Sequence, residues 1–217
     1  GIVLGVYIGT IVLLNIPNIQ QAMSVFVAEE LSEVLNTKVV IGRINMGLLN
    51  RIIIDDVLLD DQSGQEMLKV TRLSAKFDIM PFFKGKISIS SVQLFGFNIN
   101  LRKETPDSPP NFKFVLDAFA SKDTVKKENS LDLRINSILI RRGRMSYHVL
   151  SEEETPGKFN AKHIQLQNII ANISLKALSK DSLNLGIKRL SLDEKASGFS
   201  LKKMSLKLVA NNKQTNI

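Results

Sequence analysis

The sequence predicts a mainly β protein: an N-terminal membrane helix and an amphipathic helix, then a curved, open, groove-like sheet of repeating strand units with one short helix inserted. Two observations favour this fold class. One spacing of apolar residues recurs eight times along the chain, and the positions between the apolar pairs are polar in nearly every copy. Repetition at this depth is typical of a repeat architecture.

The stretch from residue 86 to residue 101 shows the spacing most clearly. Ile87 and Ile89 are two residues apart, as are Val92 and Leu94, but two serines separate the pairs. A strand presents residues i and i+2 on one face, so a gap of three would move the second pair to the other face. One extra residue, as in a β-bulge, returns both pairs to one face and bends the strand.

The pattern apolar-x-apolar-x-x-apolar-x-apolar fits from eight starting residues: Val39, Ile52, Leu68, Ile87, Leu133, Ile164, Leu185 and Phe199. All 32 apolar slots hold Val, Ile, Leu, Met, Phe or Ala. The central pairs, where we predict the bulges, are Gly42-Arg43, Asp55-Asp56, Thr71-Arg72, Ser90-Ser91, Asn136-Ser137, Gln167-Asn168, Lys188-Arg189 and Lys202-Lys203. The alternative is that these segments are ordinary amphipathic strands of another all-β fold.

An apolar face that no second sheet covers would form a trough, and such a patch indicates an apolar ligand or partner. We expect the trough to be lined by residues at the repeat slots. They are Ile41, Ile44, Ile54, Val57, Val70, Leu73, Ile87, Ile89, Val92, Leu94, Leu133, Ile135, Ile138, Ile140, Leu166, Ile169, Ile187, Leu190, Leu201 and Met204.

The composition of the 217 residues narrows the possible partners. The net charge of +8 indicates anionic partners such as phospholipid head groups or nucleic acid. No RNA- or DNA-reading module is present, so we expect no nucleic-acid partner. We interpret Arg141-Arg142-Gly143-Arg144 as a solvated strand end or turn. The absence of cysteine excludes disulfides and is compatible with a bacterial periplasm.

Two segments of helical character precede the strands. Residues 1–16 contain no charged residue, and we interpret them as the C-terminal part of a membrane-spanning helix. A cleaved signal peptide and a buried core helix are the alternatives. In residues 17–36, apolar residues recur at helical spacing after Pro17, which suits a first helical turn. This amphipathic helix should cap the first strands rather than lie on anionic lipid, because it carries three glutamates.

Residues 104–130 interrupt the repeat. The prolines of residues 105–110 cannot continue a sheet, because proline lacks the backbone donor. Phe112, Val115, Leu116 and Phe119 follow at helical spacing. We expect a short helix here that packs against the end of the apolar face. Contact with a lipid or a partner protein is the alternative.

No constellation of catalytic or metal-binding residues stands out. Asp55, Asp56 and the pair Asp60-Asp61 lack the ligand order of a calcium loop. His148 and His163, the only histidines, are in no metal motif, and we interpret each as a strand or strand-edge residue. No GxSxG, Walker or GxGxxG motif occurs. We therefore expect no enzymatic activity, no metal and no cofactor.

The order of these features resembles the AsmA-like family, in its Bacteroidetes TamB (translocation and assembly module) branch. The resemblance is carried by residues 17–68, by GKISISSVQLFGFNINL, by SPPNFKFVLDAFASKDT, and by PGKFNAKHIQLQNI with ISLKALSKDSLNL. It covers almost the whole chain. It implies residues 1–16 as an inner-membrane helix, residues 17–36 as an amphipathic helix and residues 37–217 as a periplasmic β-groove with the helical insertion near 104–130.

The resemblance also implies a function. Members of this family are bridge-like proteins whose apolar groove is thought to carry phospholipid acyl chains from the inner toward the outer membrane. They are usually far longer, so this chain resembles the N-terminal part, and contact with an outer-membrane barrel of the BamA type would belong to a missing C-terminal region. The alternative function is a scaffold that hands unfolded strands to such a barrel by strand addition.

Overall fold

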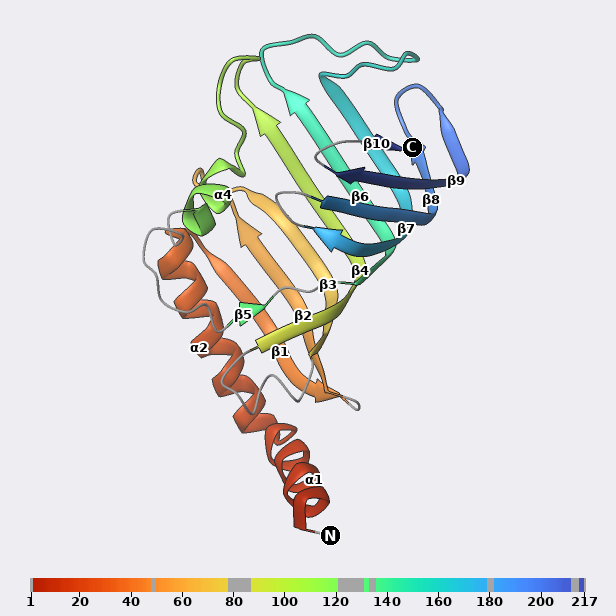
Figure 1. The fold of residues 1–217 in the computed structure, drawn as a ribbon. Coiled ribbons are helices and arrows are strands. Elements are labelled where there is room, and N and C mark those ends of the chain that lie inside the picture. The colour runs from red at the N-terminus through yellow and green to blue at the C-terminus, as the bar shows by residue number, and fades with distance from the viewer. Residues whose placement is uncertain are drawn as a thin grey trace.

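The protein folds into one open sheet preceded by two helices (Figure 1). The computed structural model describes residues 2–47, 50–77, 87–120, 131–132, 136–178, 182–211 and 215–216. Within these residues the sheet has ten strands, of which eight are long and two, β5 and β10, contain two residues each. The mainly β, open-sheet prediction is therefore confirmed.

The elements follow one another in a simple order. The helices are α1 (Ile2–Leu14), α2 (Pro17–Leu35) and α4 (Lys113–Ala120). The strands are β1 (Val39–Gly47), β2 (Arg51–Asp60), β3 (Glu66–Phe77), β4 (Ile87–Lys103), β5 (Leu131–Asp132), β6 (Ser137–Val149), β7 (His163–Leu178), β8 (Ser182–Glu194), β9 (Ser200–Asn211) and β10 (Thr215–Asn216).

The strands lie in the sheet almost in chain order, β1-β2-β3-β4-β6-β7-β8-β9-β10, with β5 beside β4. Neighbouring long strands are antiparallel except β4 and β6, which are parallel. Parallel neighbours need a long crossover, and the segment that contains α4 supplies it. The insertion predicted at residues 104–130 thus separates two antiparallel halves of one sheet.

The first helix, α1, projects away from the sheet (Figure 1). Val6, Ile8, Val12 and Leu13 are each more than half exposed, and no charged residue lies among residues 2–14. None of the helices in the described residues has both the length and the apolar character required to cross a membrane. The predicted membrane anchor therefore stays a prediction.

The second helix, α2, lies against β1 and confirms the predicted capping role. Pro17 occupies its first turn, and Asn36 ends it in the left-handed conformation, with φ of 48°. Leu35 is buried with Val39, Ile41 and other residues of β1–β3, and Met23, Val27, Ala28 and Leu31 pack against this cluster. The amide of Val39 donates to the hydroxyl of Ser32 at 3.0 Å, which joins the helix to the first strand.

The inserted helix α4 also packs at this end of the apolar face, as predicted. Phe112, Phe114, Val115 and Ala118 contact the cluster that α2 covers. Leu116, which the helical spacing placed among the apolar contacts, is instead 58% exposed. The side chain of Phe119 lies outside the described residues.

Many strands contain a residue of irregular backbone conformation near the middle. Four of these residues have positive φ: Asp56 in β2, Gly96 in β4, Arg142 in β6 and Asn168 in β7. Asp, Asn and Gly tolerate this region best, whereas Arg142 is the unusual occupant. In the strand register Asp56 falls opposite Gly42 and Thr71, and Gly96 falls between Thr71 and Arg142. The irregularities therefore form one line across the sheet.

Several of these irregularities were predicted from the central pairs of the repeat. The pairing register shifts by one residue at Ser90, at Lys188-Arg189 and at Lys202-Lys203, and again beside Asn168. Asp56 is irregular through its φ of 56° rather than through a register shift. At these positions the extra or left-handed residue lets both apolar pairs of a unit share one face.

The unit that begins at Leu133 lies partly outside the described residues, so the bulge predicted at Asn136-Ser137 stays a prediction. β6 begins at Ser137 and carries a further irregularity, which the repeat does not predict, at Arg142. The basic run 141–144 is therefore the middle of a strand, not a strand end or turn. The guanidinium of Arg142 lies 5.3 Å from the centre of the Phe95 ring, a cation–π contact that holds the kinked residue.

Gly143 marks the closest packing on the apolar face. A Cβ added there would lie 2.4 Å from two ring carbons of Phe97 and 3.0 Å from the Cβ of Ile169. The Phe97 ring thus occupies the place of a side chain at position 143. This lets β4 and β7, which β6 separates, bury Phe97 and Ile169 in one cluster with Val70.

Two buried carboxylates close hairpin turns at one end of the sheet. Asp61 accepts hydrogen bonds from the amides of Ser63 and Gln65 and pairs with Arg102 at 2.6 Å. Glu194 accepts from the amides of Ala196, Ser197 and Gln165. Burial alone would raise the pKa of Glu194, but the hydrogen bonds from the Ser197 hydroxyl and these amides outweigh burial and lower the pKa to about 2.

We expect the substitution Gly143→Ala to lower the free energy of unfolding by about 1–3 kcal/mol, because it overpacks the Phe97 ring. Urea unfolding of the full chain measures this loss. The double variant Phe97→Leu/Gly143→Ala should recover part of it, since leucine leaves room for the methyl group. An equal cost of Gly143→Ala in both backgrounds would show that the ring is not the cause.

We expect acid to destabilise the protein partly through Glu194. Its pKa is about 2 in the folded chain, against 4.5 ordinarily, so its stabilising effect is complete above pH 4.5 and is lost as the pH falls toward 2. The shift corresponds to at most about 3 kcal/mol. Glu194→Gln should lower stability at pH 7 and flatten the pH dependence of unfolding between pH 4.5 and pH 2. A profile parallel to that of the exposed control Glu153→Gln would contradict this assignment.

Candidate functional site

The candidate site is the apolar face of the sheet, defined here as the face that carries the repeat slots. Residues directly opposite each other on paired strands point to the same face. One row of such residues runs unbroken through all eight long strands: Ile44, Ile54, Leu73, Leu94, Ile140, Ala171, Leu190 and Met204. We call this the central row.

A second complete row runs parallel to the central row, and in each strand residues of the polar face separate the two rows. It consists of Met46, Ile52, Ala75, Val92, Ile138, Ile173, Ile187 and Leu206. Every member of both rows is apolar. The face is therefore continuously apolar across the full width of the sheet, and not only within single hairpins.

The apolar face is packed more tightly where it crosses the line of irregular residues. Val70, Phe97 and Ile169 are 4%, 7% and 8% exposed. Around them pack Val57, Leu68, Leu73, Leu94, Ile99, Ile140, Met145, Leu166 and Leu192. These residues come from β2 to β8, so the apolar side chains bury one another along the curve of a single sheet.

Helices cover only one end of this face. In the described part of the chain, α2 packs along β1 and α4 packs beside it, and no helix packs against the strands from β6 to β9. Ile44 is buried beneath this helical end, whereas Leu73, Leu94, Ile140, Leu190 and Met204 of the central row are half-exposed. From β6 onward, no helix among the described residues covers the apolar face.

The predicted lining residues fall on this face wherever their side chains are described. Ile41, Ile44, Val70 and Ile169 are buried. The half-buried ones are Ile54, Val57, Leu73, Val92, Leu94, Ile138, Ile140, Leu166, Ile187, Leu190, Leu201 and Met204. Leu133 and Ile135, and the side chains of Ile87 and Ile89, lie outside the described residues.

Sequence reasoning missed four contributors, Phe97, Ile99, Met145 and Ile173. A second unit with the same spacing, Val92, Leu94, Phe97 and Ile99, overlaps the unit that begins at Ile87. This overlapping unit indicates the apolar role of Phe97 and Ile99 from the sequence alone. Met145 follows Gly143, which breaks the apolar pattern because its slot is filled by a ring from another strand.

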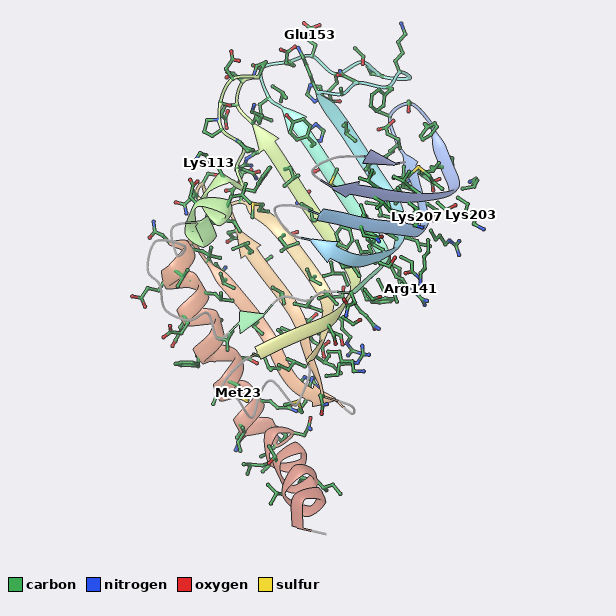
Figure 2. All side chains as sticks on the ribbon, in the orientation of Figure 1. Met23, Lys113, Arg141, Glu153, Lys203 and Lys207 are labelled. Atoms are coloured by element: carbon green, nitrogen blue, oxygen red, sulfur yellow. The ribbon has the colours of Figure 1, made fainter. Side chains whose placement is uncertain are left out.

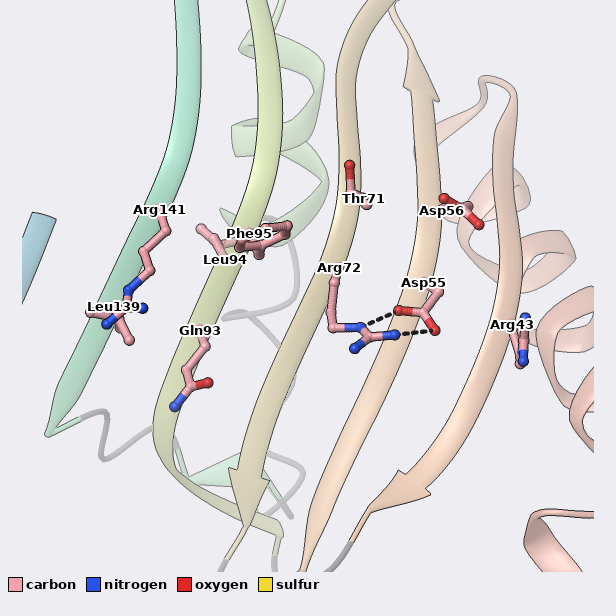
Figure 3. Close-up of a pocket in the computed structure, with 10 residues that line it drawn as sticks. All are labelled: Arg43, Asp55, Asp56, Thr71, Arg72, Gln93, Leu94, Phe95, Leu139 and Arg141. Atoms are coloured by element: carbon pink, nitrogen blue, oxygen red, sulfur yellow. Dashed lines mark hydrogen bonds and ion pairs between the residues drawn. The ribbon is translucent and has the colours of Figure 1, made fainter. Parts of the chain in front are cut away.

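The opposite face of the sheet is polar and hollowed. A hollow of about 810 Å³ is lined by Arg43, Asp55, Arg72, Phe95, Arg141 and their neighbours (Figure 3). Asp55 is 8% exposed and accepts two hydrogen bonds from Arg72, at 2.6 and 3.1 Å. The hydrogen bond and the charge of Asp55 raise the pKa of Arg72.

The bulged pairs give this polar face its charge. Arg43, Arg72, Arg141 and Arg142 lie along the line of irregular residues, Lys188, Arg189, Lys202 and Lys203 form the bulges of β8 and β9, and all eight are exposed. Figure 2 shows Arg141, Lys203 and Lys207 projecting on the side of the sheet away from α2. The sheet therefore separates an apolar face from a basic one.

The aspartates near this line hold charges within the protein instead of converging on a cation. Asp55 pairs with Arg72 and Asp61 with Arg102. Asp56 is exposed at the bulge.

No family model, no curated protein and no solved structure matches the chain. The resemblance to the AsmA-like family therefore remains a prediction. The described residues present a continuous apolar face that crosses all eight long strands.

Proposed function

We propose that this protein binds phospholipid acyl chains on its apolar face and carries them between the inner and outer membranes of a bacterial envelope. The observation that supports this is the central row: eight apolar residues in register, of which those of β3, β4, β6, β8 and β9 are partly exposed, while Ala171 of β7 is buried. Acyl chains gain about 0.8 kcal/mol for each CH₂ that leaves water. A row of near-equivalent apolar residues makes each sliding step nearly neutral in free energy, which favours movement along the face.

We infer that α1 anchors the protein in the inner membrane, with the strands in the periplasm. A helix that is apolar on every side requires an apolar environment. The exposed Val6, Ile8, Val12 and Leu13 have none within the described part of the chain. Membrane insertion of this end would place the start of the sheet close to the lipid source.

A scaffold for outer-membrane protein assembly, with a BamA-type barrel as partner, is the second candidate. It is supported by the open sheet, which leaves β1 and β10 as edge strands. Edge strands offer backbone donors and acceptors to a client strand. The two candidates differ in what should copurify: phospholipid in one case, a peptide paired with an edge strand in the other.

We expect the intact protein to stay in carbonate-washed membranes and, after purification in detergent, to carry phospholipid detectable by native mass spectrometry. Ile138→Asp, on the apolar face, should reduce the bound phospholipid several-fold while the protein folds, because the half-exposed side chain can reach water. Leu139→Asp is the matched control, since Leu139 is the next residue, also half-exposed, and points to the polar face.

Three outcomes would count against these proposals, each separately. Recovery of the protein in the soluble fraction would contradict the anchor. Equal phospholipid on Ile138→Asp and Leu139→Asp would contradict lipid binding at the apolar face. Misfolding of Ile138→Asp alone would show that this face is packed core, where a buried charge costs several kcal/mol. Client peptide without phospholipid would favour the scaffold.

A further inference from the structure

The two histidines of the chain meet where β6 ends and β7 begins. His148 and His163 are the last register pair of these strands, although 14 residues separate them in the sequence. Their Nδ1 atoms lie 3.0 Å apart, and their ring planes are tilted by 52°. Two nitrogen ligands of a tetrahedral zinc ion are about 3.3 Å apart, so a small opening of the pair would admit the ion.

The surroundings of His163 fix which of its nitrogens carries the proton. Its Nε2 lies 2.9 Å from the backbone oxygen of Glu152, which can only accept a hydrogen bond. Nε2 therefore carries the hydrogen, and the lone pair of Nδ1 points at His148. His163 is only 7% exposed, so its ring is held in this orientation. A carbonyl bonded to the far nitrogen is the usual arrangement for a metal-binding histidine.

Glu154 adds a carboxylate to this pair. Its Oε1 lies 3.8 Å from Nδ1 of His148, and one ligand atom from each of the three residues lies within 4.8 Å of the other two. The connection that carries Glu154 is tied to the strands. Val149 donates its amide to the carbonyl of Lys162 at 2.9 Å, and Asn160 donates to the carbonyl of Glu153 at 3.2 Å.

The geometry points to a site for a divalent transition-metal ion of the zinc class, with His148 Nδ1, His163 Nδ1 and the Glu154 carboxylate as ligands and water at the fourth position. Imidazole suits zinc, nickel and copper, whereas magnesium and calcium take oxygen ligands. Without metal, Nδ1–H of His148 donates to Nδ1 of His163. The ion takes the place of that proton and ties the β6–β7 connection to the strand ends.

This inference is independent of lipid binding, because the site lies at a strand end and not on the central row. The composition makes it simple to test. The chain has two histidines and no cysteine, so no other imidazole or thiolate can hold the ion. Glu153 and Glu154 are adjacent and both exposed, but only Glu154 belongs to the cluster. They form a matched pair of substitutions.

The experiment is calorimetric titration of zinc chloride into the full chain, purified without a histidine tag and treated with EDTA. We expect one saturable site, and a tetrahedral absorption spectrum when cobalt(II) replaces zinc. Glu154→Gln should weaken zinc binding about 10-fold or more, the lower bound set by loss of a supporting residue around a metal. His148→Gln should abolish binding, and Glu153→Gln should leave it unchanged.

Magnesium chloride in place of zinc should show no binding at the site. The proposal is overturned if zinc binds to no saturable site, or if Glu154→Gln and Glu153→Gln bind zinc equally. Zinc binding that survives in a folded His148→Gln variant, checked by circular dichroism, would overturn it as well. Should His148→Gln fail to fold, the comparison of the two exposed glutamates still decides the question.

Discussion

The structure depends on one constraint: most long strands carry an irregular residue near the middle. Strand geometry alternates side chains between two faces, so a three-residue gap would split the apolar residues of each strand between them. A bulge or a left-handed residue at positions such as Asp56, Gly96 or Arg142 cancels that split. Because these residues fall in register, their effects add across the sheet, and the result is one bent sheet with one apolar face.

The same line explains where the charge lies and why a single layer is stable. The residues of the bulged pairs face away from the apolar side, and eight exposed arginines and lysines lie there. On the apolar side, curvature lets side chains of non-adjacent strands meet, as Phe97 does over Gly143. The hairpin ends are held by buried Asp61 and Glu194, whose pKa values are lowered by the hydrogen bonds that they accept. The protein thus needs no second sheet to bury part of its apolar surface.

Local sequence spacing predicted many of the bulges and the apolar face, and it failed where contacts between distant strands determine the structure. The bulges at Lys188-Arg189 and Lys202-Lys203 could be predicted because apolar pairs flank both of these polar pairs in the sequence. The irregularity at Arg142 was not predicted because the neighbouring position, 143, is a glycine, and only the Phe97 ring from β4 explains that glycine. The pairing of His148 with His163 depends on strand register and loop length, so no motif spacing could show it. The resemblance to AsmA-like proteins added an expected ligand, and the register supplied a surface that fits it.

The central claim is that acyl chains lie along the whole central row. A photo-reactive benzophenone amino acid, placed in living bacteria at Ile54, Leu94 or Leu190, tests it most directly, because these residues sample β2, β4 and β8 of that row. The account predicts phospholipid adducts at all three positions and none at Gln93 or Arg189, which lie on the opposite face. Adducts on both faces alike, or on neither, would contradict it.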